Sequence, residues 1–119
     1  MQITSFMDSR PFNEQCPVGR ASEVFGDRCT LMILRDLFQD GACRFSDFNA
    51  RERGFSINTL SDRLKKLEGA CYIKKSKYQE HPLRFEYRLT PEGNKLGNVI
   101  EAMYLWGKSP SGRRVISRR

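Results

Sequence analysis

The stretch SINTLSDRLKKLE, Ser56 to Glu68, has the pattern of one amphipathic helix. Ser56 is a typical N-cap, because its hydroxyl can accept hydrogen bonds from the free N–H groups of the first turn. Gly69 stands where a left-handed C-cap is expected. Apolar side chains recur at helical spacing and predict one buried stripe, made of Ile57, Leu60, Leu64 and Leu67.

The opposite face of this helix carries amides, hydroxyls and cations. Such a face can enter a DNA major groove, where Asn pairs with adenine, Arg with guanine and Lys with phosphates. We expect Asn58, Thr59 and Arg63 to read bases. The alternatives are a solvated surface helix, a purely capping role for Ser56, and an ion pair of Arg63 with Asp62 or Glu86. The candidate DNA-binding residues of the helix are Ser56, Asn58, Thr59, Arg63, Lys65 and Lys66.

The segment before Ser56 predicts three more helices. Pro17 favours the first helical position, which makes Cys16 an N-cap, and Asp27 can cap the next helix. A helix, a turn and a capped helix with a polar face form the helix-turn-helix pattern. The helices are expected at 17–25, with Val18, Ala21, Val24 and Phe25 buried, at 28–38, and from Phe45 or Ser46, before a turn at 51–55.

After Gly69 the apolar period changes from about four residues to two, which indicates strands at 71–78 and 84–89. A β-hairpin directly after a recognition-type helix is a wing. We expect its cations to contact the phosphate backbone, with His81 or Arg84 approaching the minor groove. The candidate wing residues are Lys74, Lys75, Lys77, His81 and Arg84.

A last helix is predicted from Thr90, its N-cap, and Pro91, its first residue, to about Trp106. Its apolar face is broader than a core this small can cover. We therefore predict a homodimer, the commonest oligomer, with packing on the helix's own domain as the alternative. The candidate dimer-interface residues are Val18, Leu96, Val99, Ile100, Met103, Tyr104 and Trp106.

The charge of this 119-residue chain is uneven. Its formal net charge is +7, with +4 between Ser56 and Arg88 and +5 between Lys108 and Arg119. A basic second half suggests a polyanionic partner, and double-stranded DNA fits it better than membrane lipid, because no strongly hydrophobic amphipathic helix accompanies the charge. The N-terminus is polar and no apolar run is long enough to span a membrane, so we expect a cytoplasmic protein.

The four cysteines, Cys16, Cys29, Cys43 and Cys71, form no C-x-x-C pair, and His81 is the only histidine. We therefore expect free thiols, no metal site and no cofactor, with Cys71 in the core and Cys43 exposed. Catalysis is not expected either, since there is no Gly-rich phosphate loop and no defensible carboxylate pair. The competing functions are a winged-helix protein-interaction module and a non-specific nucleic-acid-binding protein.

Six sequence words in order resemble the HxlR-type winged helix-turn-helix regulators, relatives of the MarR group. One departure is Cys29, which stands where the family usually has a Trp. The words are CPV at 16–18, TLMILRDL at 30–37, RFSDF at 44–48, GFSINTLSDRLKKLE at 54–68, RFEYRLTPEG at 84–93 and WG at 106–107.

The resemblance implies a mainly α fold with a small β-hairpin (α+β), in the order of four helices, two strands and a helix. The residues themselves divide the chain into an N-terminal arm at 1–14, a DNA-binding and dimerisation domain at 15–108, and a basic tail at 109–119 that we expect to be disordered. This lengthened basic tail is a second departure from the family. The resemblance also implies a bacterial or archaeal transcription factor, commonly a repressor, that binds pseudo-palindromic operator DNA as a homodimer through its first and last helices.

Cys16 carries a separate hypothesis. At a helix N-terminus the dipole favours the thiolate, which is the reactive form. Some members of the resembled family sense quinones, aldehydes or oxidants through a cysteine near the N-terminus. A small electrophile or oxidant that modifies Cys16 would then change DNA binding. The alternative is an unreactive, half-buried thiol.

Overall fold

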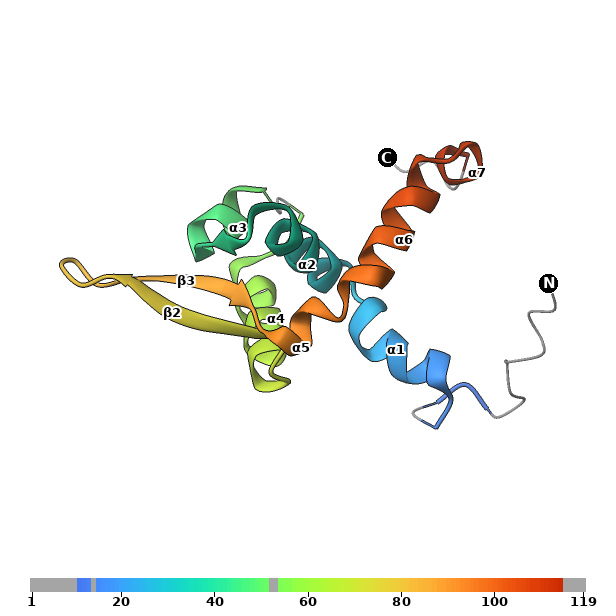
Figure 1. The fold of residues 1–119 in the computed structure, drawn as a ribbon, viewed down its shortest axis with the longest axis horizontal. Coiled ribbons are helices and arrows are strands. Elements are labelled where there is room, and N and C mark those ends of the chain that lie inside the picture. Colours follow the sequence, from blue (N-terminus) through green and yellow to red (C-terminus); the bar gives the residue numbers. More distant parts are fainter. Residues whose placement is uncertain (1–10, 14, 52–53, 115–119) are drawn as a thin grey trace.

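The computed structural model describes residues 11–13, 15–51 and 54–114, so most of the predicted arm and residues 115–119 of the predicted tail lie outside the described residues. Figure 1 shows α2, α3 and α4 as a central body, with the β2–β3 hairpin projecting from one side and α1 and α6 on the other. The described elements are α1 (Pro17–Phe25), α2 (Arg28–Asp40), β1 (Ala42–Cys43), α3 (Phe45–Arg51), α4 (Ile57–Gly69), β2 (Ile73–Gln79), β3 (Arg84–Leu89), α5 (Pro91–Asn94), α6 (Gly97–Lys108) and α7 (Pro110–Arg113).

The predicted fold class is confirmed: the chain is mainly helical with a small antiparallel sheet, as in winged helix-turn-helix proteins. The core lies where α2 crosses α4, because both helices direct a dense apolar stripe inward. Cys29, which stands where the resembled family usually has a Trp, is a member of this core, and Phe25 packs against the core. The buried apolar residues are Cys29, Ile33, Leu34, Leu37, Cys43, Phe48, Leu60, Leu64, Leu67 and Ile73.

Helix α4 begins as predicted, since the Ser56 hydroxyl accepts from the backbone N–H of Thr59 at 3.0 Å. The prediction that Ile57 is buried is wrong: its side chain is 59% exposed, because the core beneath α4 begins one turn later. The expected left-handed Gly69 is also wrong. The helix continues through Gly69, and Cys71 takes the left-handed position with a φ of 67°.

The end of α4 explains the late start of β2. The N–H of Cys71 donates to Glu68 and that of Tyr72 to Leu67, each at 3.0 Å, which together form a Schellman motif. Strand β2 therefore starts at Ile73 rather than Cys71, and Cys71 is exposed instead of lying in the core.

A third strand, β1, was not predicted. It is only two residues long and pairs Ala42 with Arg88 and Cys43 with Tyr87, so the sheet order is β1-β3-β2. This pairing buries the Cys43 side chain to 1% exposure and overturns the expectation that it is exposed.

Helix α1 has its predicted bounds, but its predicted buried face is only half right. Val24 and Phe25 pack against the core, whereas Val18 and Ala21 are exposed in the protomer. Ala21 nevertheless lines the cavity between α1 and α4 that is described below.

The predicted last helix is in fact two helices. Thr90 caps the first as expected, accepting from the N–H of Gly93 at 3.0 Å. A Cβ at Gly93 would lie 2.0 Å from the Tyr72 carbonyl oxygen, and one at Gly97 would lie 3.0 Å from the Phe38 ring. The chain bends between these two close approaches, so α5 ends at Asn94 and α6 starts at Gly97.

Helix α7 forms within the predicted disordered tail. The Ser109 hydroxyl accepts from the N–H of Gly112 at 3.1 Å and caps this short helix. In the part of the chain that the structure describes, no helix is both long and apolar enough to cross a membrane.

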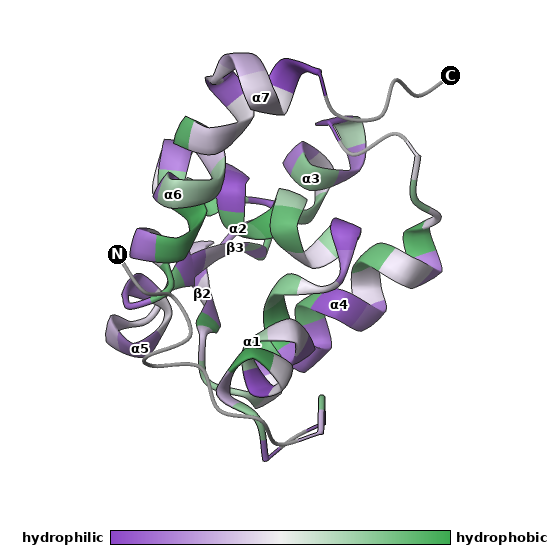
Figure 2. Cartoon of the chain, turned by 90° about the vertical axis from the view of Figure 1, so that its right-hand side faces the viewer, coloured by the Kyte–Doolittle hydropathy of each residue, from purple (hydrophilic) through white to green (hydrophobic). Residues whose placement is uncertain are grey.

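Helix α6 leaves its apolar face uncovered. None of its residues is buried, and the Trp106 side chain is 53% exposed. Figure 2 shows hydrophobic residues of α6 at the edge of the molecule, away from α4. Leu96 and Ile100 pack against the core, and the large exposed apolar residues are Val99, Met103, Tyr104, Leu105 and Trp106.

Candidate nucleic-acid interface

The polar face of α4 is presented to solvent. Its three leucines point into the core, so the residues between them must point outward, and Asn58, Lys65 and Lys66 are exposed. Thr59 is half-buried, and its hydroxyl accepts from the Ser56 hydroxyl at 3.0 Å. Ser56 therefore does cap the helix, and its exposed hydroxyl stays at the surface beside Asn58.

Arg63 is held by two carboxylates. Its Nε donates to Asp27 at 3.0 Å, and its Nη1 donates to Asp62 at 2.7 Å. These hydrogen bonds raise the pKa of the Arg63 guanidinium. The structure therefore contains the alternative that the sequence allowed, an ion pair of Arg63 with Asp62. We call the hydrogen bonds of Arg63 to Asp27 and Asp62 the Arg63 clamp. Arg63 can read a base only when this clamp opens.

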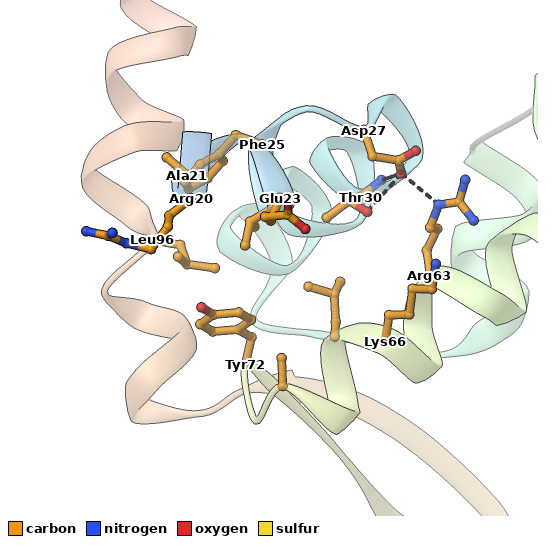
Figure 3. Close-up of a pocket in the computed structure, with 13 residues that line it drawn as sticks. Arg20, Ala21, Glu23, Phe25, Asp27, Thr30, Arg63, Lys66, Tyr72 and Leu96 are labelled. Atoms are coloured by element: carbon orange, nitrogen blue, oxygen red, sulfur yellow. Dashed lines mark hydrogen bonds and ion pairs between the residues drawn. The ribbon is translucent and has the colours of Figure 1, made fainter. Parts of the chain in front are cut away.

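Asp27 is a residue that sequence reasoning gave only a capping role. Its carboxylate accepts from both the N–H and the hydroxyl of Thr30, at 2.9 and 2.8 Å, as well as from Arg63 (Figure 3). Burial acts to raise the pKa of Asp27, but the hydrogen bonds from Arg63 and Thr30 outweigh it, and the pKa is lowered. Asp27 therefore joins the start of α2 to the middle of α4.

A cavity of about 770 Å³ lies behind this clamp, between α1 and the second half of α4 (Figure 3). Its floor is apolar and includes Val24, Leu67 and Tyr72. Charged side chains from both helices surround it, among them Glu23 of α1 and Lys66 of α4. The cavity wall thus contains part of the predicted recognition helix.

The register of the wing separates its lysines. Lys75 lies opposite Tyr87 and Lys77 opposite Phe85, so these two lysines share a face with the aromatic side chains. Lys74 lies opposite Arg88 on the other face. The structure therefore does not bring Lys74 together with Lys75 and Lys77.

The tip of the wing is exposed and partly ion-paired. Lys77 contacts Glu80 at 2.9 Å, whereas His81 and Arg84 lie on the exposed turn and at the start of β3. The Gln79 amide donates to the Pro82 carbonyl oxygen at 3.1 Å and closes the turn.

The cysteines differ in accessibility. Cys16 is the half-buried N-cap of α1 and makes no side-chain cap hydrogen bond. Burial raises the pKa of Cys43 to about 11, which keeps it a protonated, unreactive thiol. Cys29 is buried as well, so Cys16 and Cys71 are the accessible thiols. Among the described residues, no group of three or more His, Cys, Asp or Glu is placed to hold a metal ion.

Comparison with known proteins identifies relatives of this chain. Residues 24–114 match the HxlR-like helix-turn-helix family. An uncharacterised HTH-type transcriptional regulator of Mycobacterium tuberculosis is 42% identical over 90 residues, which cover 76% of this chain and 56% of the relative. The chain thus spans little more than half the length of that relative. The Bacillus subtilis regulator YvaP is 33% identical over 95 residues, 79% of this chain and 87% of its own.

Solved structures agree with the sequence relatives. The redox regulator HypR in its reduced form superposes with a TM-score of 0.74 at 27% identity, covering 83% of this chain and 95% of its own. Its oxidised form gives a TM-score of 0.73 at 27% identity, covering 78% and 95%. The capped α3–α4 pair, the basic wing and the match over residues 24–114 lead to one conclusion: this chain belongs to the HxlR-like helix-turn-helix family.

Proposed function

We propose that this protein is a cytoplasmic transcriptional regulator that binds pseudo-palindromic operator DNA as a homodimer, and that it represses by blocking a promoter. The observation that carries the proposal is the exposed polar face of α4 beside a basic wing. Three buried leucines and the Arg63 clamp fix that helix on the body, so its outer face is preorganised for a major groove.

The residues divide into two roles. Asn58 and Thr59 read base edges from the first turns of α4, whereas Lys65 and Lys66 contact phosphates. Arg63 either reads a base after leaving Asp27 or positions the helix through that ion pair. In the wing, Lys75 and Lys77 contact the backbone, and His81 or Arg84 reaches the minor groove.

The homodimer is supported by apolar side chains that the protomer leaves exposed on α1 and α6. Val18 and Trp106 are both about half exposed, at 50% and 53%. A symmetric interface through these helices would cover them and would place two α4 helices on one side of the dimer. Half-sites would then lie about one helical turn apart.

Control by thiol chemistry is the finer part of the proposal. Cys16 starts α1, a helix of the proposed interface, and a similar structure is that of a protein named a redox regulator. Oxidation or electrophile addition at Cys16 would change how the two protomers pack and hence the spacing of their α4 helices. Cys16→Ser should abolish the response of DNA binding to diamide, while Cys71→Ser, the matched exposed-thiol control, should keep it. An unchanged response in Cys16→Ser would reject this control mechanism.

The test of DNA binding is fluorescence anisotropy with duplexes that tile the DNA upstream of the protein's own gene. Unrelated competitor DNA in excess and near-physiological salt remove non-specific binding. Tight, competitor-resistant binding to one tile is expected. Absence of binding even at low salt would favour a winged-helix module that contacts proteins, and equal weak binding to all tiles would favour a non-specific nucleic-acid-binding protein.

A further inference from the structure

The last residues of α6 and α7 form a second strongly basic surface. Residues 108–119 contain five Lys or Arg and no Asp or Glu. Three of these cations lie in the described part of the chain, and all three are exposed. We call this surface, made of Lys108, Arg113 and Arg114, the basic end.

The basic end lacks the acidic partners that many other cations of the protein have. Ion pairs join cations to carboxylates in α3, in the wing and beside α5. Examples are the pairs Arg51–Asp40, Lys77–Glu80 and Lys95–Glu92. Among the described residues, no carboxylate pairs with a cation of the basic end, and the same holds for Lys65 and Arg84. The basic end therefore shares its uncompensated charge with the proposed DNA-binding face.

Local contacts give the basic end a defined shape. The Arg113 guanidinium donates through Nη1 to the Lys108 carbonyl oxygen at 2.6 Å. A Cβ at Gly112 would lie 2.2 Å from the Trp106 carbonyl oxygen, so α7 folds closely against the end of α6. These contacts gather the cations on one surface instead of spreading them along an extended chain.

The chemistry of the basic end favours a phosphate backbone over a membrane surface. Insertion into anionic lipid needs apolar side chains beside the cations. Met103 and Trp106 belong to the proposed dimer interface, and Lys108 Nζ lies over the Tyr104 ring, 5.3 Å from its centre. Helix α7 has the sequence PSGR, without a large apolar side chain. Exposed cations alone are enough to hold nucleic-acid phosphates.

The basic end also lies far from the proposed DNA-binding face. Figures 1 and 2 both show α7 at the far end of α6, with α2 and the rest of α6 between it and α4, and Figure 1 shows the wing on the other side of the body. Duplex DNA is stiff over about 150 base pairs. A short duplex on α4 therefore does not bend around the same protomer to reach α7.

We propose that the basic end binds the phosphates of a second DNA duplex, so that the protein bridges two DNA segments. This inference rests on the proposed function, which places the first duplex on α4 and the wing. It adds a separate surface whose contacts are not specific for sequence, because cations that meet phosphates do not read bases.

The test is capture of a second duplex by protein that already occupies its operator. The upstream tile that binds the protein is attached sparsely to a surface and saturated with protein, and unbound protein is washed away. A fluorescein-labelled duplex of unrelated sequence, two helical turns long, is then added over a range of salt concentrations. The parent protein should capture the labelled duplex at low salt and release it as salt rises.

The double variant Arg113→Ala, Arg114→Ala should capture the second duplex more weakly. Because two phosphate contacts are removed, the slope of log K against log salt for capture should fall in magnitude by about 2. Binding to the operator tile alone, measured by anisotropy, should stay that of the parent. This second readout shows that the variant is folded and that its α4 face is intact.

Two controls separate charge from fold and from place. Arg113→Lys with Arg114→Lys keeps both charges at the same positions and should capture the second duplex as the parent does. Lys95→Ala removes an exposed cation outside the basic end and should also leave capture unchanged.

The outcomes distinguish this proposal from the proposed function. If the parent protein binds its operator but captures no second duplex, or if the double Ala variant captures it as well as Lys95→Ala does, the bridging proposal is wrong and operator binding stands. Equal losses of operator binding and capture in the double Ala variant would place the basic end in the first interface and also reject bridging. Binding of operator-loaded protein to phosphatidylglycerol vesicles, without capture of DNA, would assign the basic end to lipid instead. If the parent protein binds no tile even at low salt, both proposals are wrong.

Discussion

Helices α4 and α6 are nearly equal in length, at 13 and 12 residues, but they pack against the body of the protomer in opposite ways. Helix α4 buries Leu60, Leu64 and Leu67 and shows its polar side to solvent. Helix α6 buries no residue and shows Met103 and Trp106 to solvent. Under the proposed function, this difference means that the DNA-reading helix is complete within one chain, whereas α6 needs a second apolar surface to cover it.

The largest expected effect comes from truncating the buried face of α4. Leu64→Ala removes a fully buried side chain and leaves a cavity between α2 and α4, so the free energy of unfolding should fall by about 2–5 kcal/mol. Urea unfolding followed by circular dichroism measures this. Leu105→Ala removes the same atoms from exposed α6 and serves as the control, with a much smaller loss at concentrations where the protein is monomeric.

The second effect concerns the uncovered face of α6. Met103→Glu places a charge in the proposed interface, and the dimer should weaken by at least about 2 kcal/mol, while the circular dichroism spectrum stays that of the parent. Sedimentation velocity over a dilution series measures the dissociation constant. Gln79→Glu adds the same charge on the wing, far from α6 in Figure 1, and should leave the dimer unchanged. A parent protein that is monomeric at micromolar concentration would remove the basis of this prediction.

The third effect separates the two ends of the DNA interface. If Asn58 reads a base edge as proposed, Asn58→Ala should cost about 1–3 kcal/mol on the operator with little change on random DNA. If Lys75 contacts phosphate as proposed, Lys75→Ala should weaken binding to both duplexes alike. Anisotropy titrations with the two duplexes make the comparison, and equal losses for Asn58→Ala on both would show that this residue does not read sequence.

The smallest effect is expected from breaking the Asp27–Arg63 ion pair, which is partly solvent-exposed. Arg63→Gln should lower the free energy of unfolding only slightly at neutral pH, because solvent screens this ion pair. The folded-state pKa of Asp27 is lowered, so its stabilisation is present above the ordinary Asp value of about 3.9 and is lost as pH falls below it. The difference in unfolding free energy between the parent and Arg63→Gln should therefore disappear in acid. Urea unfolding at neutral pH and at a pH below the ordinary Asp pKa measures this difference. A difference that does not depend on pH would show that the Asp27–Arg63 ion pair is not its cause.

Local signals predicted most of the fold. The caps at Ser56, Asp27 and Thr90 mark helix starts that depend only on neighbouring residues, and each side chain accepts the hydrogen bond expected of it. The break between α5 and α6 was missed, because it arises where Gly97 passes Phe38, a contact between residues distant in sequence. Strand β1 was missed for the same reason, since only its pairing with β3 defines it.

In the candidate site, too, local sequence predicts some features, whereas others depend on contacts between residues that are distant in sequence. The polar face of α4 is visible in the sequence because helical spacing places Asn58 opposite the leucines. The Asp27–Arg63 hydrogen bond joins residues 36 positions apart, from the N-cap of α2 to the middle of α4. Such contacts depend on the packing of separate elements, which periodicity does not report.

The proposed function requires two copies of α4 to act on one DNA duplex. The most direct measurement is hydroxyl-radical footprinting of the bound tile, with the stoichiometry from sedimentation equilibrium. We expect two protomers per duplex and two protected segments about one helical turn apart. One protomer per duplex, or a single continuous protected segment whose position shifts with the ends of the duplex, would contradict it.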